Sequence, residues 1–338
     1  MSRRKLLVLN LKLFDDVMNA TTSKTSGNDL SAEMKTYYSD YLIDIAGPKL
    51  VHDQFGQRHP IPKNGGKTIE FRKYSPLGKS LTPLTEGVTP DGQALNVKTV
   101  TATVAQYGGW VRLTDMLLLT AIDNNLVHAV ELLGDQAGQT LDTITREVLN
   151  GGTSVQYAEG QVTARNLLTR DHKLTVNCIE RAARFLKTQN AQKIEGSYVA
   201  IIHPDCTYDL RHDPDWQEMN KYTTPELAWE GEIGKLAGVR FVETTEAKVW
   251  EKAGKQGSDG TTPTIYSTLV LGKNAYGVTE ITGGGLETIV KQLGSGGTAD
   301  PLNQRASAGW KATKTAERLV EQYMVRIETA SSFDSKAN

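Results

Sequence analysis

Residues 83–95 read PLTEGVTPDGQAL, a polar stretch with two prolines and two glycines that lies between two strand-like segments. Before it, KTIEFRKY (67–74) alternates the apolar Ile69 and Phe71 with charged residues, and after it VKTVTATVAQY (97–107) alternates in the same way. Alternation with a period of two predicts β-strands. The connection between these strands is far longer than the roughly 2–5 residues of a usual hairpin loop. A loop of this kind in a folded domain is typically functional or disordered.

A long helix is predicted downstream of this hairpin. From residue 125 to residue 150 the apolar residues recur at steps of three and four, and Gly151-Gly152 then ends the helical pattern. Gly134 and Gly138 lie inside the helix, where each glycine costs about 1 kcal/mol of helix propensity relative to alanine. We therefore expect something to pack closely against the face that carries them.

The middle of the chain predicts a separate α/β unit. Thr175 is expected to cap a helix whose apolar face runs from Ile179 to Leu186. The last two predicted strands are short and return to an earlier sheet, so the fold class is α+β with the α/β unit inserted in a discontinuous domain. The further predicted strands are WVRLT (110–114, after a break at Gly108-Gly109), SYVAIIHP (197–204), GVRFVETT (238–245), IYSTLVLG (265–272), GWKATKTA (309–316) and YMVRIETA (323–330).

Composition and termini narrow the class of protein. The net charge of -1 disfavours a dedicated DNA-binding protein, and two cysteines in 338 residues predict a fold without disulfides in a reducing compartment. No segment has the roughly 18 apolar residues of a membrane span, and a signal peptide is not expected because Asn10 and Lys12 interrupt the apolar run near the N-terminus. Residues 15–29 predict a flexible polar arm, and a first helix is expected from Leu30 to the stop at Gly47-Pro48.

The strongest candidate for chemistry is the segment HPDCTYDLRHDPDW (203–216). One interpretation makes His203 and Asp205 metal ligands at the end of a strand. The other, which we favour, makes Pro204-Asp205 a helix cap and the remaining polar residues solvated, because no HExxH or CxxC motif accompanies them. The glycine runs ITGGGLE and LGSGGTAD lack the spacing of phosphate loops. The sequence therefore predicts no enzyme, no cofactor and no metal.

Aromatic residues cluster in DPDWQEMNKYTTPELAWEG (213–231), which includes Trp216, Tyr222 and Trp229. The segment is predicted as a loop. Its aromatic residues are more often local core pieces than contacts between subunits.

Taken together, these motifs resemble the major capsid proteins of tailed bacteriophages with the Hong Kong 97-type fold, and more narrowly the phage N-four-like major capsid family. The resemblance covers nearly the whole chain, and PLTEGVTPDGQAL together with the YGGWVRLTD part of VTATVAQYGGWVRLTD is its most specific part. The residues that carry it are NLKLF (10–14), PLTEGVTPDGQAL (83–95), VTATVAQYGGWVRLTD (100–115), the helix to Asn150, AIIHPD (200–205), GVRFVET (238–244), GWKA (309–312) and MVRIE (324–328).

The resemblance implies a division of the chain into subdomains. It implies an N-terminal arm (1–29) and a peripheral domain (30–160) that contains the spine helix, at about 125–150, and the extended E-loop hairpin, at about 72–98. An axial domain (161–300) and a return to the peripheral domain (301–338) follow. The interface residues that we expect are Leu77, Lys79, Leu81, Leu84 and Glu86 of the E-loop and Gly134 and Gly138 of the spine helix.

The implied function is self-assembly into the hexamers and pentamers of an icosahedral head that encloses double-stranded DNA, contacted without sequence specificity. The implied partners also include a portal, a decoration protein and a scaffold. A separate scaffold protein is expected because only about thirty residues precede the first predicted helix. The resemblance places the protein in the virion after assembly in the bacterial host cytoplasm, with no membrane partner.

Two alternatives stay open. One is an encapsulin-like compartment shell of the same fold that holds protein cargo instead of DNA. The other, which we disfavour, is a metal-dependent hydrolase centred on His203, Asp205 and His212.

Overall fold

The fold is taken from a computed structural model, which describes residues 51–74, 77–84, 86–87, 89, 91–121, 125–158, 162–220, 234–257, 260–279, 286–295 and 300–338. The arm and first helix predicted before residue 51 lie outside the described residues. The chain forms two compact units. The first contains Gly108–Gly134 and Glu287–Lys311, and the second contains Ala46–Tyr107, Asp135–Leu286 and Ala312–Asn338.

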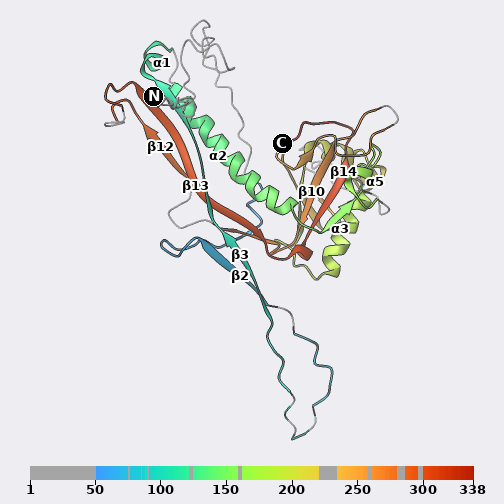
Figure 1. The fold of residues 1–338 in the computed structure, drawn as a ribbon. Helices are drawn as coiled ribbons and strands as arrows, with labels where there is room; N and C mark the ends of the chain where they lie inside the picture. The colour runs from blue at the N-terminus through green and yellow to red at the C-terminus, as the bar shows by residue number, and fades with distance from the viewer. Residues whose placement is uncertain are drawn as a thin grey trace, which may run out of the picture. The chain divides into compact units, whose positions relative to one another are not determined.

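The second unit is built on a seven-stranded sheet in the order β5-β14-β10-β6-β8-β7, with β9 paired to β10. Figure 1 shows β10 and β14 side by side in this sheet. Strand β10 (Ile265–Leu271) pairs antiparallel with β14 (Met324–Ala330) over its full length and with β6 (Tyr198–Ile202) on its other side. Every residue of β10 and β6 is buried, as continuous apolar runs predict for central strands. The other strands of this sheet are β5 (Val155–Tyr157), β8 (Val239–Glu243), β7 (Lys235–Leu236) and β9 (Val249–Trp250).

Helix α3 (Val176–Thr188) contributes its apolar face to the core of this sheet, where Ile179, Ala182 and Leu186 are fully buried. Thr175 is the N-cap residue, as predicted, but its side chain makes no capping bond. The Asp213 carboxylate accepts a hydrogen bond from the Val176 N–H instead, at 2.8 Å. The further helices of the unit are η3 (Arg165–Leu167), α4 (Pro204–Arg211), α5 (Pro214–Asn220) and η5 (Glu321–Tyr323).

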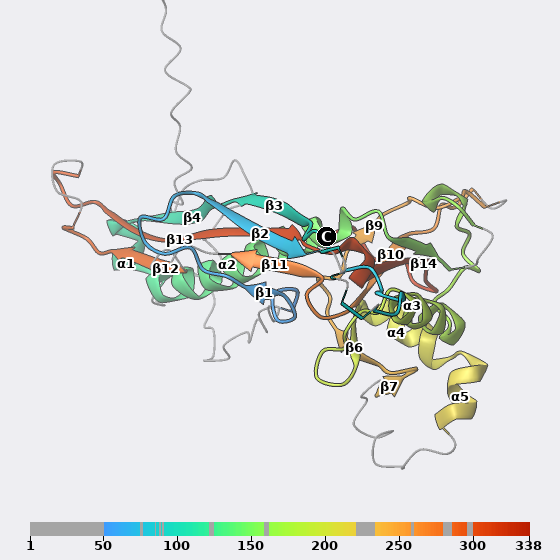
Figure 2. The ribbon, with the colours of Figure 1, turned by 90° about the horizontal axis from the view of Figure 1, so that it is seen from below.

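Strand β13 (Arg305–Arg318) organises the second sheet and is much longer than the short run predicted for it. Its residues from Ala306 to Ala316 alternate between buried and partly exposed positions, which is the pattern of a strand with one face in a core. In the first unit β12 (Glu287–Lys291) pairs with it, and in the second unit β11 (Tyr276–Thr279) does so, with β1 (Gln57–Arg58) beyond β11 (Figure 2).

Strand β4 (Ala105–Thr114) also pairs with β13 and runs straight through the glycine pair at which we predicted a break. The glycines are needed for close approach and not for a turn. A Cβ atom on Gly108 would lie 2.7 Å from the backbone oxygen of Trp310, which is closer than a carbon atom tolerates. The predicted strand WVRLT is therefore the second half of one longer strand.

The predicted hairpin is confirmed. Strands β2 (Thr68–Tyr74) and β3 (Val97–Thr103) pair antiparallel from Thr68↔Thr103 to Tyr74↔Val97. Phe71 and Ala102 lie on the buried face of this ribbon.

Helix α2 (Asn125–Asn150) has the bounds that the apolar repeat predicts, and the short helix α1 (Asp115–Thr120) precedes it, capped by the Thr114 hydroxyl. Within the described ranges, no helix combines the length and the apolar character that crossing a bilayer requires.

The last strand of the chain joins the sheet of the α/β unit. Strand β14 is the neighbour of β10 there, and it lies in residues 301–338, for which the return to the peripheral domain stays a prediction. Strand β5, from the segment predicted as peripheral, pairs with the other edge of β14. The chain therefore completes the α/β sheet with a strand contributed from each side of the predicted insertion.

Candidate interaction surfaces

The loop between β2 and β3 leaves its apolar side chains in solvent. Leu77, Leu81 and Leu84 are 54%, 82% and 75% exposed, and Leu95 on the returning side is similarly open. Figure 1 shows the loop continuing beyond the ends of both strands without reaching another element of its unit. Exposed leucines are unremarkable singly, but several on one unpaired segment mark a surface for association.

Little within the chain holds this loop in place. Among its described residues, one side-chain bond crosses it, from Gln93 Nε2 to the Gly78 backbone oxygen at 3.2 Å. Gly87 has φ +78°, in the region that favours glycine, so the chain bends there without strain. Lys79 and Glu86 are both exposed. The structure thus brings the five predicted loop residues into one exposed segment, but gives them no common contact.

Gly134 and Gly138 lie on an open face of α2. Of the described residues, none has an atom within 4 Å of a Cβ atom built on either glycine. The close packing expected at these glycines is therefore not supplied by the described part of this chain. The buried residues of the helix beside this face are Ala129, Leu133 and Ala137.

The first unit exposes a second apolar surface that sequence reasoning missed. Trp110 on β4 is 55% exposed, and the Arg112 guanidinium lies 4.7 Å from the centre of its ring. The alternation in WVRLT signalled a strand with one solvent face, but it did not show that the tryptophan would be on that face. The other exposed large apolar residues of this unit are Met116, Leu119, Leu132, Val290, Leu293 and Leu302.

A groove of about 500 Å³ runs beside Trp110 between β4, β12 and β13. Arg112, Lys291 and Arg305 line it, and so does Asp300, whose carboxylate accepts hydrogen bonds from the Gln304 and Arg305 backbone N–H groups. The groove therefore combines an aromatic surface with an excess of positive charge.

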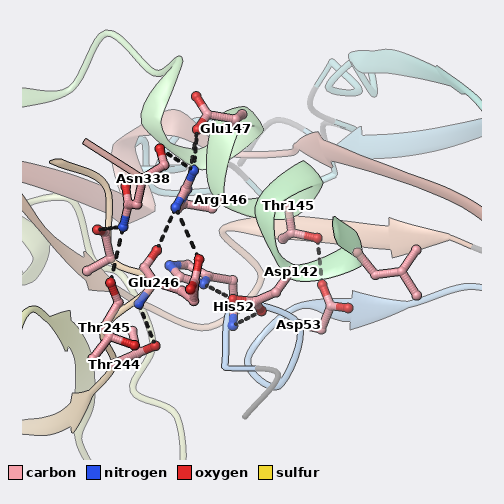
Figure 3. Close-up of polar contacts among 12 residues, drawn as sticks. His52, Asp53, Asp142, Thr145, Arg146, Glu147, Thr244, Thr245, Glu246 and Asn338 are labelled. Atoms are coloured by element: carbon pink, nitrogen blue, oxygen red, sulfur yellow. Dashed lines mark hydrogen bonds and ion pairs between the residues drawn. The ribbon is translucent and has the colours of Figure 1, made fainter. Parts of the chain in front are cut away.

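A polar network fixes the second half of α2, where sequence reasoning assigned no role (Figure 3). Asp142 accepts a 2.8 Å bond from the His52 backbone N–H, and its other oxygen lies 2.6 Å from His52 Nδ1, with both residues buried. Asp53 pairs with Lys314 of β13 and accepts a bond from the Thr145 hydroxyl. These contacts join segments that are far apart in the sequence, so no local pattern could have predicted them.

Arg146 forms the other half of this network. Its buried guanidinium donates to the backbone oxygens of Glu246 and Asn338, at 3.0 and 3.1 Å, and to the Glu147 carboxylate (Figure 3). Burial alone would raise the pKa of Glu147, but hydrogen bonds from Lys248 and Arg146 outweigh it and lower that pKa. The network holds α2 in place.

The residues of the HPDCTYDLRHDPDW segment are committed to structural contacts. His203 is the N-cap of α4 and its Nδ1 accepts from the Asp205 N–H, so the helix begins where predicted but His203, not Pro204-Asp205, is the capping residue. Asp205 accepts from the Tyr266 and Ser335 hydroxyls, at 2.7 and 2.6 Å. His212 bonds the Tyr208 backbone oxygen.

These side chains do not converge. Asp209 binds Ser331 and Ser332, and burial raises the pKa of the Cys206 thiol. Among the residues the structure describes, no three His, Cys, Asp or Glu side chains gather closely enough to hold a metal ion. The described contacts of the segment are therefore those of a structural part of the α/β unit.

The aromatic segment that follows is not a loop at its start. Residues Pro214–Asn220 form helix α5, and Trp216 is buried against Phe241 with ring centres 6.4 Å apart. This tryptophan is a core residue, as favoured above. Tyr222 and Trp229 lie outside the described residues.

Comparison with known proteins gives a consistent set of matches. The sequence profile of a family described as "Phage capsid protein" matches residues 97–281. The fold is similar to the capsid of Ralstonia phage GP4, with a TM-score of 0.67 and 16% identity over 94% of this chain and 100% of that chain. It is also similar to the capsid asymmetric unit of cyanophage Pam1, with a TM-score of 0.67 and 12% identity over 98% and 100% of the two chains.

The capsid of cyanophage P-SCSP1u gives a TM-score of 0.65 at 14% identity over 91% of this chain and 97% of that one. No curated protein sequence matches.

Proposed function

The chain belongs to the phage capsid protein family, and from this premise we propose that it is the major capsid protein of a tailed bacteriophage, which assembles into the pentamers and hexamers of an icosahedral head. The observation that carries the proposal is the family match over residues 97–281, in a chain whose α+β fold follows phage capsid chains over nearly its whole length. The family is structural and the chain is not an enzyme. The narrower N-four-like assignment stays a prediction from the sequence motifs.

The loop between β2 and β3 supplies a physical reason for assembly. A leucine that passes from water into an interface contributes about 1.5–3 kcal/mol if it is fully buried. Leu81 and Leu84 gain little of this free energy in the isolated chain and Leu77 only part of it, since they are 82%, 75% and 54% exposed. If a neighbouring subunit in a ring covers the loop, the burial free energy of these leucines is gained on assembly. The same gain then repeats at every interface of a closed shell.

The subdomains follow from the same proposal. The hairpin at about 72–98 is the E-loop, α2 is the spine helix of the peripheral domain, and the α/β sheet is the core of the axial domain. The open face at Gly134 and Gly138 is a second contact between subunits, because a face without side chains lets another backbone approach closely. Residues 1–29 are the N-terminal arm.

The partners are first of all further copies of the chain. A portal, a scaffold and a decoration protein complete the head, which encloses double-stranded DNA after assembly in the host cytoplasm. The net charge of -1 suits a shell that must tolerate packed phosphates without binding them tightly. The compartment shell and the metal-dependent hydrolase are not favoured.

The test is sedimentation velocity of the purified full-length chain, with negative-stain images of every fast fraction. We expect closed shells or ring-shaped capsomers, formed alone or with a candidate scaffold protein. Deleting residues 77–94 should abolish them, and Lys255→Ala, at an exposed position of the α/β unit, should not. A chain that stays monomeric with every scaffold tested would overturn the proposal. Particles that co-purify with protein cargo and no nucleic acid would indicate the compartment shell.

A further inference from the structure

The α/β unit has an open sheet edge beside two arginines. Strand β5 is the end strand of the seven-stranded sheet and pairs with β14 alone. The Ser154 carbonyl accepts from the Arg326 N–H, and the Ala158 N–H donates to Glu328. In a parallel ladder alternate residues bond the same neighbour, so the backbone groups of Val155 and Tyr157 point the other way. Within the described ranges they have no backbone partner.

A groove of about 400 Å³ adjoins this edge. Residues 153–157 line one side of it, and Arg181, Arg184 and Phe185 of α3 line the other. Gln156 holds the two sides in register, since its Nε2 donates to the Cys178 backbone oxygen of α3 at 2.8 Å. The groove is therefore built from a sheet edge and a helix that are fixed to each other.

The two arginines form no ion pair within the described ranges. Arg181 is half-buried and Arg184 is exposed, and no acidic side chain in the described part of the chain pairs with either. Elsewhere in this unit buried cations are paired, as Arg146 and Lys314 are. Arg181 is partly desolvated and has no carboxylate among the described residues, so with the exposed Arg184 beside it in the groove it is a site for a carboxylate supplied from outside.

We propose that this groove binds an extended acidic peptide segment of a second protein. The segment adds a strand to β5 through Val155 and Tyr157, and its carboxylates pair with Arg181 and Arg184. Side chains alternate along a strand, so acidic residues at every second position all face α3. Strand addition supplies backbone affinity and the arginines supply selectivity for charge. The inference goes beyond the shell proposal and holds for the chain whether or not it is assembled.

The probe is a fluorescent seven-residue peptide in which Glu and Val alternate, titrated by anisotropy against the full-length chain. We expect it to bind at least about tenfold more tightly than the same peptide with Gln for Glu. Methylating alternate amide nitrogens on the edge that faces β5 should abolish binding, and methylating the other edge should not. The double substitution Arg181→Glu/Arg184→Glu should weaken binding of the Glu-Val peptide by at least about tenfold. The variant should instead bind a peptide in which Lys and Val alternate.

The matched control is Lys187→Glu on the exposed face of the same helix, outside the groove, which should leave binding unchanged. Binding of the Lys-Val peptide shows that the double variant is folded. Equal binding of the Glu and Gln peptides, or no effect of methylation, would overturn the proposal. So would equal competition by a seven-nucleotide oligothymidylate, which would indicate a phosphate site. If the wild-type chain does not bind the peptide and the double variant no longer self-associates, the groove binds a second copy of this chain and not another protein.

Discussion

The loop between β2 and β3 and the central strand β10 place similar leucines in opposite environments. Leu269 in β10 is 2% exposed, between two hydrogen-bonded neighbouring strands, whereas Leu81 in the loop is 82% exposed and has no strand beside it. The sheet satisfies its own backbone and buries its own side chains, so it is stable within one chain. The loop does neither. The comparison distinguishes residues that stabilise the fold of one chain from residues whose burial requires a second subunit.

The largest effect should come from opening a cavity in β10. Leu269→Ala removes a buried side chain and should lower the free energy of unfolding by about 2–5 kcal/mol. Leu81→Ala in the loop is the matched control and should change it by less than about 0.5 kcal/mol. Urea denaturation followed by circular dichroism measures both. Equal losses would mean that the loop belongs to the cooperative fold, and the contrast would be wrong.

The next effect tests the network that holds α2. Asp142→Ala leaves the buried His52 without the acceptor of its backbone N–H and ring nitrogen, which should cost about 1–3 kcal/mol. Glu131→Ala, at an exposed position of the same helix, should cost little. Denaturation of the two variants measures the difference. If Asp142→Ala is neutral, the network does not anchor the helix.

A smaller effect should depend on pH. Burial lowers the pKa of His203 and Asp205 offsets this only in part, so the folded chain binds a proton at this site less readily than the unfolded chain does. The contribution of His203 to the free energy of unfolding is therefore fully present above its ordinary pKa of 6.5. As the pH falls below 6.5 this contribution is lost, by at most about 1.4 kcal/mol per pH unit. His203→Asn keeps a capping side chain but cannot titrate. The His203→Asn variant should show a smaller change in the free energy of unfolding between pH 6.5 and pH 5 than the wild type does, measured by urea denaturation at each pH. If the two chains change equally, other groups cause the pH dependence.

The smallest change in stability should come from the open face of α2. Gly134→Ala should stabilise the isolated chain by about 1 kcal/mol, because alanine favours the helix and nothing described lies near its Cβ. If a neighbouring subunit packs on this face, the same variant should weaken assembly. Thermal melts and sedimentation of one preparation measure both. A variant that melts lower, or assembles as well as the wild type, would remove this glycine from the interface.

Local periodicity predicted the elements that carry their own signals. Helix α2 has a long apolar repeat and a glycine pair at its end, and its predicted bounds match Asn125–Asn150. The hairpin strands alternate cleanly, and β2 and β3 pair as expected. The family was also readable, because the motif of the loop and the strand after it is specific. All of these signals lie within short stretches of sequence.

What failed depends on contacts between distant residues. Strand β13 was predicted too short because the residues it adds at its ends, RASA (305–308) and ER (317–318), are small or charged, and their pairing with β12 and β11 is not visible in the sequence. The glycines of β4 read as a break, but they fit against the backbone of Trp310. The place of β14 in the α/β sheet depends on pairing with β10, which nothing in either strand specifies. Interface residues are harder still, because their partners belong to another chain.

The central claim is that the loop leucines serve association and not folding. Its most direct test is the double variant Leu81→Ser/Leu84→Ser, compared with the wild-type chain by sedimentation velocity under conditions in which the wild type assembles, and by urea denaturation of both as monomers. We predict an unchanged denaturation midpoint together with loss of the fast-sedimenting particles. Particles that form as readily as those of the wild type, or a midpoint that falls, would contradict the claim.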